Sequence, residues 1–158
     1  MAQSPSVRRR AWPSLDAVPS PPHNAGAMSD APPRSSVPPD IVIVDRRIDP
    51  RELARLTGRF FGDMVKLVVD IDRGIAAVGG ELHADAEALL LDAGSRPEHI
   101  WGANYFPGRG RERCLEFTAL INIRPSLGNR SMEVQDERVR ERIRNIAVSL
   151  LGEGEPLP

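Results

Sequence analysis

Four polar residues that could do chemistry occupy every second position of one short segment. They are Glu81, His83, Asp85 and Glu87, and leucine or alanine stands between them. In an extended strand all four side chains would point to the same side. Carboxylates beside one imidazole suit general acid and base catalysis, with His83 and Asp85 as the catalytic candidates. The alternative is a solvated sheet face that carries no site.

The same segment supplies candidate ligands for a metal ion. Glu81, His83 and Asp85 together could bind a divalent cation, the one cofactor that these residue types suggest. Zinc sites usually draw on more histidine or cysteine than this segment contains. A helix would split the group, because His83 would then pair with Glu87 and Glu81 with Asp85. We favour a strand over 81–88, although the alanines and leucines of this segment favour a helix.

A second group of polar side chains suits the binding of an anion. The candidate ligand-binding residues are Asn104, Asn122, Arg124, Asn129, Arg130 and Ser131, with Ser126 beside them. Guanidinium groups, amides and hydroxyls donate hydrogen bonds to phosphate or carboxylate. The sequence therefore predicts a small anionic molecule as the partner. A structural role is the alternative, because Gly128 and Asn129 are common in turns and Arg124 could pair with Glu116.

Other catalytic signatures are weak or absent. No GxxxxGK[ST] loop occurs, and 108–110 lacks the third glycine and the strand-to-helix context of a dinucleotide-binding loop. Cys114 has no reactive context nearby and is expected to be a small residue within a strand. Trp101 and Tyr105 could stack on a ligand, but aromatic residues of strands usually belong to the core.

The composition excludes several classes of partner. The chain carries 21 basic and 22 acidic residues, so its net charge favours neither nucleic acid nor an anionic membrane. No apolar run approaches the roughly 20 residues that span a bilayer. The single cysteine cannot form an internal disulfide. We therefore expect a soluble protein of the reducing cytoplasm, and a homo-oligomer remains open.

The chain divides sharply near Asp40. Nine of the 15 prolines precede this residue, and few aliphatic residues accompany them. Such a segment cannot bury enough apolar surface to offset its ordering entropy, so 1–40 is predicted to be a disordered leader, with Met28 as an alternative start. Residues 41–152 are expected to form a single domain, and 153–158 a disordered tail.

The elements that would position these residues follow from hydrophobic periodicity. A β-branched strand is expected over 41–44. A helix is expected over 50–60, because an aspartate and a proline stand where an N-cap and a first turn belong. Alternation then predicts a strand over 63–71. A turn over 72–74 leads into a return strand over 75–78, and the two strands should form a hairpin.

The rest of the chain predicts two strands and a helix. The strands over 100–106 and 114–124 are expected to form a hairpin through the loop 107–112. The last helix begins near Asp136 and carries its apolar residues on one stripe. The resulting order β-α-β-β-β-β-α is typical of an α+β fold. It predicts a mainly antiparallel sheet of about five strands with two helices packed on one face.

Three sequence stretches resemble a small bacterial and archaeal domain family of unknown function. They read GGELHADAE (79–87), IWGANYFP (100–107) and EFTALINIRPSLGNRS (116–131). The resemblance covers roughly residues 41–151 and leaves the leader outside. It supports the domain boundaries and implies no chemistry.

Three classes of function remain. The first is the binding of a small anionic ligand on the polar sheet face, with or without catalysis, in a cleft where His83 and Arg124 approach each other. The second is a metal-dependent hydrolase centred on His83. The third is a protein-interaction or assembly module, which an exposed apolar patch rather than a polar cleft would indicate. These residues leave open whether the domain is an enzyme.

Overall fold

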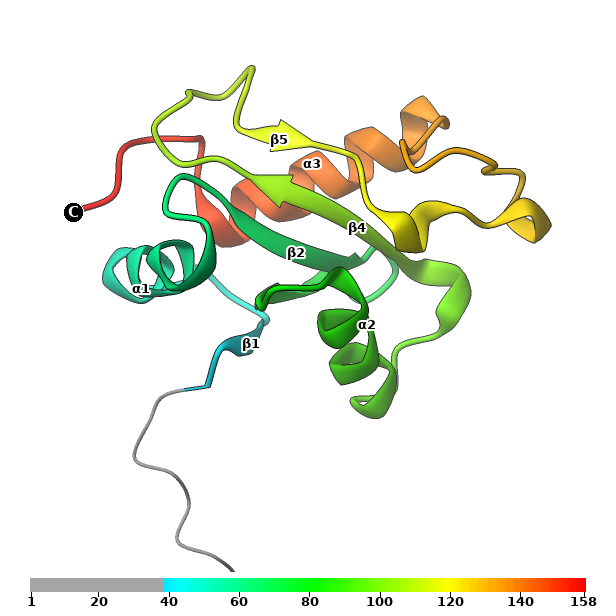
Figure 1. The fold of residues 1–158 in the computed structure, drawn as a ribbon. Coiled ribbons are helices and arrows are strands. Elements are labelled where there is room, and N and C mark those ends of the chain that lie inside the picture. Colours follow the sequence, from blue (N-terminus) through cyan, green and yellow to red (C-terminus); the bar gives the residue numbers. More distant parts are fainter. Residues whose placement is uncertain (1–38) are drawn as a thin grey trace, which may run out of the picture. The chain divides into compact units, whose positions relative to one another are not determined.

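Residues 39–158 are the part of the chain that the computed structural model describes, and they contain a five-stranded antiparallel sheet (Figure 1). The strands are β1 (Ile41–Val44), β2 (Val65–Asp70), β3 (Ile75–Gly79), β4 (Ile100–Tyr105) and β5 (Leu115–Glu116), in the order β1-β3-β2-β4-β5. The α-helices are α1 (Pro50–Phe60), α2 (His83–Asp92) and α3 (Glu137–Leu151). The predicted α+β fold is confirmed. The predicted leader lies outside the described residues, except for Pro39 and Asp40.

Helix α1 forms where the sequence predicts it. The side chain of Asp49 accepts a hydrogen bond from the N–H of Arg51 at 2.8 Å, and Pro50 occupies the first turn. These are the groups that satisfy and pre-order a helix N-terminus. Leu53 and Leu56 are buried on the side that faces the sheet.

Helix α3 also begins after an aspartate. The carboxylate of Asp136 accepts from the N–H of Arg138 at 2.8 Å. The buried residues of the helix are Ile143, Ile146, Ala147, Leu150 and Leu151. The N–H of Ile48 donates to the carbonyl of Leu150 at 2.9 Å. This bond joins the loop between β1 and α1 to the last turn of α3.

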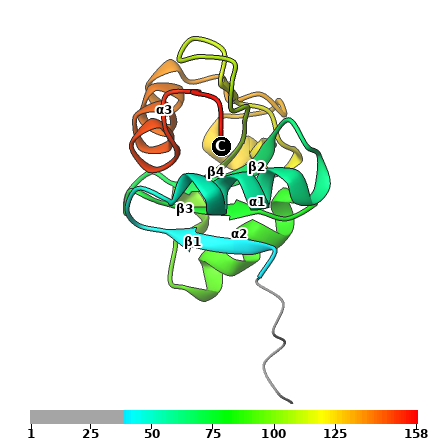
Figure 2. The same cartoon turned by 90° about the vertical axis from the view of Figure 1, so that its left-hand side faces the viewer.

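The sheet separates two apolar cores. In the larger core, Leu67 and Val69 of β2 share one cluster with the buried residues of α1 and α3. In the smaller core, Val68 of β2 and Ile100 of β4 pack with Leu90 of α2. Figure 2 shows α2 and α3 on opposite sides of the sheet. The two predicted helices do share one face, and α2 is an additional helix on the other.

Two glycines end β3 and turn the chain out of the sheet. Gly79 and Gly80 have φ angles of 111° and 83°, a conformation that favours glycine. A Cβ on Gly79 would stand 2.2 Å from the carbonyl oxygen of Asp40. The predicted strand over 81–88 is therefore wrong, because α2 begins at His83. Once the bend removes the strand partners, the helical propensity of the alanines and leucines prevails.

Strand β5 is much shorter than the predicted strand over 114–124. It covers only Leu115–Glu116, although it still forms the predicted hairpin with β4. The chain then passes through two 3₁₀-helices, η2 (Leu120–Asn122) and η3 (Pro125–Leu127). The prediction fails beyond β5 because the side chain of Asn122, instead of a strand backbone, pairs with β4.

The residues after α3 are held against the domain. Gly154 donates its N–H to the hydroxyl oxygen of Tyr105 at 3.0 Å and accepts from the N–H of Gly110 at 2.9 Å. Leu157 packs against the larger core. The residues 153–158, which were expected to form a disordered tail, thus contact the domain through Gly154 and Leu157. The buried hydroxyl of Tyr105 and the loop backbone need hydrogen-bond partners, which this segment provides.

Candidate functional site

His83 lies in the first turn of α2 and is buried instead of facing solvent. The residue is only 9% exposed, and its Nε2 lies 2.9 Å from the carbonyl oxygen of Ala103. Glu81, just before the helix, and Asp85, in its first turn, are both exposed. The period-two arrangement of these side chains is therefore lost, as the helical alternative predicts.

The residues predicted as metal ligands are not brought together. Within residues 39–158, no group of three or more histidine, cysteine, aspartate or glutamate side chains could hold a metal ion. Glu87 is engaged by Arg124, whose Nη2 lies 2.7 Å from its carboxylate. The hypothesis of a metal-dependent hydrolase thus loses the ligand set on which it was based.

The surroundings of His83 favour its uncharged form. Burial lowers the pKa of His83 below its usual value, and the ammonium of Lys66 acts in the same direction. Hydrogen bonding to the carbonyl of Ala103 opposes this decrease of the pKa without reversing it. His83 is accordingly a weaker proton donor near neutral pH than an exposed histidine.

His83 lines a cavity of about 480 Å³ between the start of α2 and η2. Lys66 of β2 and Asn104 of β4 also line it and are directly opposite each other in the sheet, so their side chains share the face that α2 covers. The remaining lining residues are Met64, Leu82, Ala84, Thr118, Ala119, Leu120, Ile121 and Met132. The cavity is thus mainly apolar, and Lys66 and Asn104 stand side by side on adjacent strands.

Three apolar side chains at this cavity are exposed. Leu82 is 55% exposed, Leu120 is 70% exposed and Met132 is 45% exposed. They come from the start of α2, from η2 and from the loop before α3. Large apolar side chains gathered around one concavity are typical of a binding surface.

Lys66 is a site residue that the sequence interpretation missed. Its Nζ donates to the carbonyl of Glu81 at 2.7 Å and lies 5.0 Å from the centroid of the Phe61 ring. Alternation along β2 already indicates that Lys66 faces away from the larger core. The signal that could have found it is its rarity, because Lys66 is the only lysine among 21 basic residues.

Arg124, a predicted anion-binding residue, is hydrogen-bonded to protein oxygens. Each of its three guanidinium nitrogens donates to a protein oxygen: Nε to the carbonyl of Ile121 at 2.9 Å, Nη1 to the carbonyl of Pro97 and Nη2 to Glu87. The side chain is only 13% exposed. Arg124 therefore joins η2 to α2 and to the loop before β4, and it is not directed into the cavity that His83 lines.

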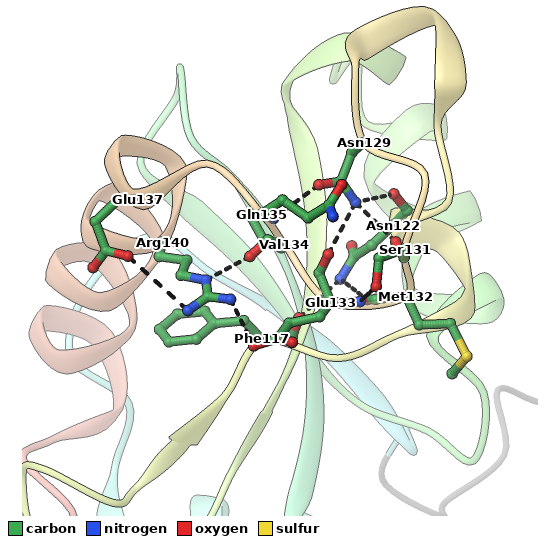
Figure 3. A network of polar contacts seen from close by, with 10 residues as sticks. All are labelled: Phe117, Asn122, Asn129, Ser131, Met132, Glu133, Val134, Gln135, Glu137 and Arg140. Carbon is green, nitrogen blue, oxygen red and sulfur yellow. Dashed lines mark hydrogen bonds and ion pairs between the residues drawn. The ribbon is translucent and has the colours of Figure 1, made fainter.

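Asn122 and Asn129, also predicted ligand-binding residues, organise the loop that follows β5 (Figure 3). Asn122 is fully buried, and its Nδ2 donates to the carbonyl of Met132 at 3.0 Å. Asn129 donates from Nδ2 to the carbonyl of Asn122 at 2.8 Å and accepts at Oδ1 from the N–H of Gln135 at 2.8 Å. Both amides are saturated by backbone groups and hold the wall of the cavity in place.

Three predicted ligand-binding residues remain: Ser131, Arg130 and Asn104. Ser131 accepts from the N–H of Glu133 at 3.1 Å, and Arg130 is exposed on the loop surface. Of the six predicted ligand-binding residues, only Asn104 lines the cavity beside His83. Its Oδ1 is buried and has no hydrogen-bond partner among the described residues.

Trp101 belongs to the larger core, as the sequence predicts, and so does Cys114, which lies just before β5 instead of within a strand. Cys114 is fully buried, and burial raises the pKa of its thiol. A protonated, enclosed thiol is a poor nucleophile. Both residues therefore contribute to the packing of the core.

The comparisons with known proteins bear on the whole domain. No helix within residues 39–158 is both long enough and apolar enough to cross a membrane. Neither curated proteins nor solved structures give a match to the chain. One family model matches residues 42–150, from β1 to the last turn of α3, under the description "Protein of unknown function (DUF5674)". This confirms the resemblance to a domain family of unknown function, and the chain belongs to the DUF5674 family.

Proposed function

We propose that this domain binds a small carboxylate with an apolar body in the cavity at the start of α2. The observation that carries the proposal is the pairing of Lys66 with Asn104 beside His83, within a cavity of about 480 Å³ whose other walls are mainly apolar. That volume lies within the range of about 300 to 1,000 Å³ that is usual for small-molecule sites.

Lys66 is the group that would neutralise the carboxylate. Its ammonium has three donor hydrogens, and the carbonyl of Glu81 is its one hydrogen-bond partner within residues 39–158. The cavity also lies at the N-terminus of α2, where the cap residue Leu82 supplies no side-chain hydrogen bond. The positive end of this helix dipole adds to the attraction for an anion.

The apolar walls would hold the body of the ligand. Leu82, Leu120 and Met132 expose surface that a ligand would remove from water, and each buried CH₂ contributes about 0.8 kcal/mol. Phosphate or another fully hydrated anion would gain nothing from these walls. The proposal therefore narrows the predicted anionic ligand to an amphiphilic carboxylate.

The test is calorimetric titration of the purified protein with 4-methylpentanoate. Its uncharged amide, 4-methylpentanamide, has nearly the same size and is the matched ligand control. We expect the carboxylate to bind about tenfold or more tightly than the amide, because hydrogen bonds to charged groups contribute about 1.5 to 3 kcal/mol. Equal affinity of the two compounds, or binding of neither, contradicts the proposal.

Two variants distinguish a specific effect of the Lys66 ammonium from an effect of the net charge of the protein. Lys66→Gln should lose the preference for carboxylate over amide. Arg138→Gln removes an exposed charge on α3, on the other side of the sheet, and should keep the preference. Because Lys66 is the only lysine, reductive ¹³C-methylation yields a single side-chain resonance. This resonance should move when 4-methylpentanoate is added.

A second candidate function is the docking of a protein segment, and the exposure of Leu82, Leu120 and Met132 favours it. An apolar side chain of a partner would fit the same cavity. In that case Leu120→Ser would abolish association with the partner. Small carboxylates would not change this association. Sedimentation of the parent protein with and without 4-methylpentanoate distinguishes the two functions when the partner is a second copy of the chain.

A further inference from the structure

The hydrogen bond of His83 determines which of its nitrogens carries the proton. A backbone carbonyl can only accept, so Nε2, at 2.9 Å from the carbonyl oxygen of Ala103, must be an N–H donor. In the uncharged imidazole, Nδ1 is then an acceptor. Nδ1 has no hydrogen-bond partner within residues 39–158, and the ring lines the cavity.

Asn104 supplies a second acceptor next to His83. Its Nδ2 donates to the carbonyl oxygen of Thr118 at 3.4 Å, and its Oδ1 is an acceptor. This Oδ1 is buried and lacks a partner in the described part of the chain. Leaving a buried acceptor unpaired costs about 1 to 3 kcal/mol.

The cavity therefore carries a surplus of acceptors. Lys66 is the cation that lines it, whereas His83 Nδ1 and Asn104 Oδ1 both require a donor. A bare carboxylate satisfies Lys66 and leaves both acceptors unpaired. An ammonium group on the ligand would donate, but it would be repelled by Lys66.

We infer that the ligand is a hydroxylated aliphatic carboxylic acid, whose hydroxyl donates to the acceptor pair of His83 Nδ1 and Asn104 Oδ1. The inference rests on the proposed carboxylate site and adds the class of its ligand. Lys66 holds the carboxylate, the hydroxyl meets the acceptor pair, and the apolar walls around Leu120 cover the aliphatic chain.

Four ligands with the same carbon chain test this inference by calorimetry at pH 8, where the imidazole is uncharged. They are 4-methylpentanoate, its 2-hydroxy and 3-hydroxy derivatives, and the 2-methoxy derivative, which can accept but cannot donate. We expect one of the two hydroxy acids to bind about fivefold or more tightly than 4-methylpentanoate. The methoxy compound should bind no more tightly than 4-methylpentanoate.

The outcomes separate this inference from the proposed function. If 4-methylpentanoate binds and neither hydroxyl group improves its affinity, the acceptor pair has no role in binding and only the inference fails. An equal gain from the methoxy group also overturns it, because that group cannot donate. If none of the four ligands binds, the proposed carboxylate site fails as well.

Two variants locate the acceptors. His83→Phe keeps a ring of similar size, and Asn104→Leu keeps a side chain of similar length, but each removes one acceptor. Each variant should reduce the preference for the hydroxy acid to less than about twofold while still binding 4-methylpentanoate. Unchanged preference in both variants contradicts the inference. Circular dichroism checks that each variant is folded, and the ligand comparison on the parent protein stands without them.

Discussion

The side chain of Asn122 and the backbone of Gly102 form a closed pair of hydrogen bonds. Oδ1 accepts from the N–H of Gly102 at 2.8 Å, and Nδ2 donates to its carbonyl at 3.0 Å. This is the pattern that a neighbouring strand would provide. One amide thus takes over the pairing of β4 where β5 has already ended.

Removal of this amide should strongly destabilise the fold. We expect Asn122→Ala to lower the free energy of unfolding by about 2 to 4 kcal/mol, because it leaves the buried backbone groups of Gly102 without partners. Urea denaturation measures the change. Asn145→Ala, at an exposed asparagine of α3, is the control and should change stability by less than about 0.5 kcal/mol.

Ala119 and Ile121 leave no room for a side chain at Gly102 of β4. A Cβ on Gly102 would stand 2.5 Å from the Cβ of Ala119, so Gly102→Ala should cost about 1 to 3 kcal/mol through overpacking. A Cβ on Gly58 of α1 would meet no side chain and no other segment within 4 Å. Gly58→Ala should therefore stabilise the protein by about 0.5 to 1 kcal/mol. Thermal unfolding of the two variants should shift in opposite directions.

The larger core depends on both helices of its face. Leu56 of α1 is 2% exposed and Ile143 of α3 is fully buried. Leu56→Ala and Ile143→Ala should each destabilise by about 2 to 5 kcal/mol. Leu120→Ala truncates an exposed side chain and should have little effect on unfolding. Changes below about 0.5 kcal/mol at Leu56 or Ile143 would contradict the packing described here.

Stability should fall as the solution becomes acidic. The pKa of His83 is lowered in the folded state, mainly by burial, so below a pH of about 6.5 the unfolded chain binds a proton that the folded chain resists. The contribution is fully present above that pH and is lost as the pH falls towards the folded pKa. Denaturation at pH 8, 6 and 5 measures it. His83→Gln should flatten this dependence.

The ion pair between Arg124 and Glu87 should couple α2 to η2. Their side chains are 13% and 23% exposed, so solvent screens them less than surface pairs. A double-mutant cycle with Arg124→Met and Glu87→Gln should give a coupling energy of about 1 kcal/mol or more. The exposed pair Arg96–Glu98 should give less than about 0.5 kcal/mol in the same experiment. Equal coupling in the two cycles contradicts a structural role for Arg124.

Local signals in the sequence were sufficient for much of the fold. The N-cap at Asp49, the start of the last helix near Asp136 and the strand predicted over 63–71 depend on neighbouring residues only. Both helix starts are confirmed, and the strand covers 65–70. In the segment 81–88, the alternation of polar and apolar residues favoured a strand, whereas its alanines and leucines favoured a helix. Its outcome depended on the bend at Gly79, where a long-range contact with Asp40 excludes any side chain.

The candidate site was harder to predict because long-range contacts decide which polar groups remain free. Arg124 and Asn122 have the chemistry of ligand-binding residues, but their partners come from α2 and β4. Lys66 appeared to be an ordinary strand residue until the start of α2 was placed beside it. His83 and Asn104 were identified from residue type, and their shared cavity depends on a helix that was predicted as a strand.

The bond between Ile48 and Leu150 has a consequence for the protein during its synthesis. The carbonyl partner of Ile48 is translated about 100 residues later, which at roughly 5 to 20 residues per second is a delay of about 5 to 20 seconds. Once β2 and β3 have been synthesised, they lack the cover that α3 provides until the end of that interval, and their apolar face is exposed to other nascent chains. We therefore expect slow codons between α2 and α3 to lower the yield of folded protein.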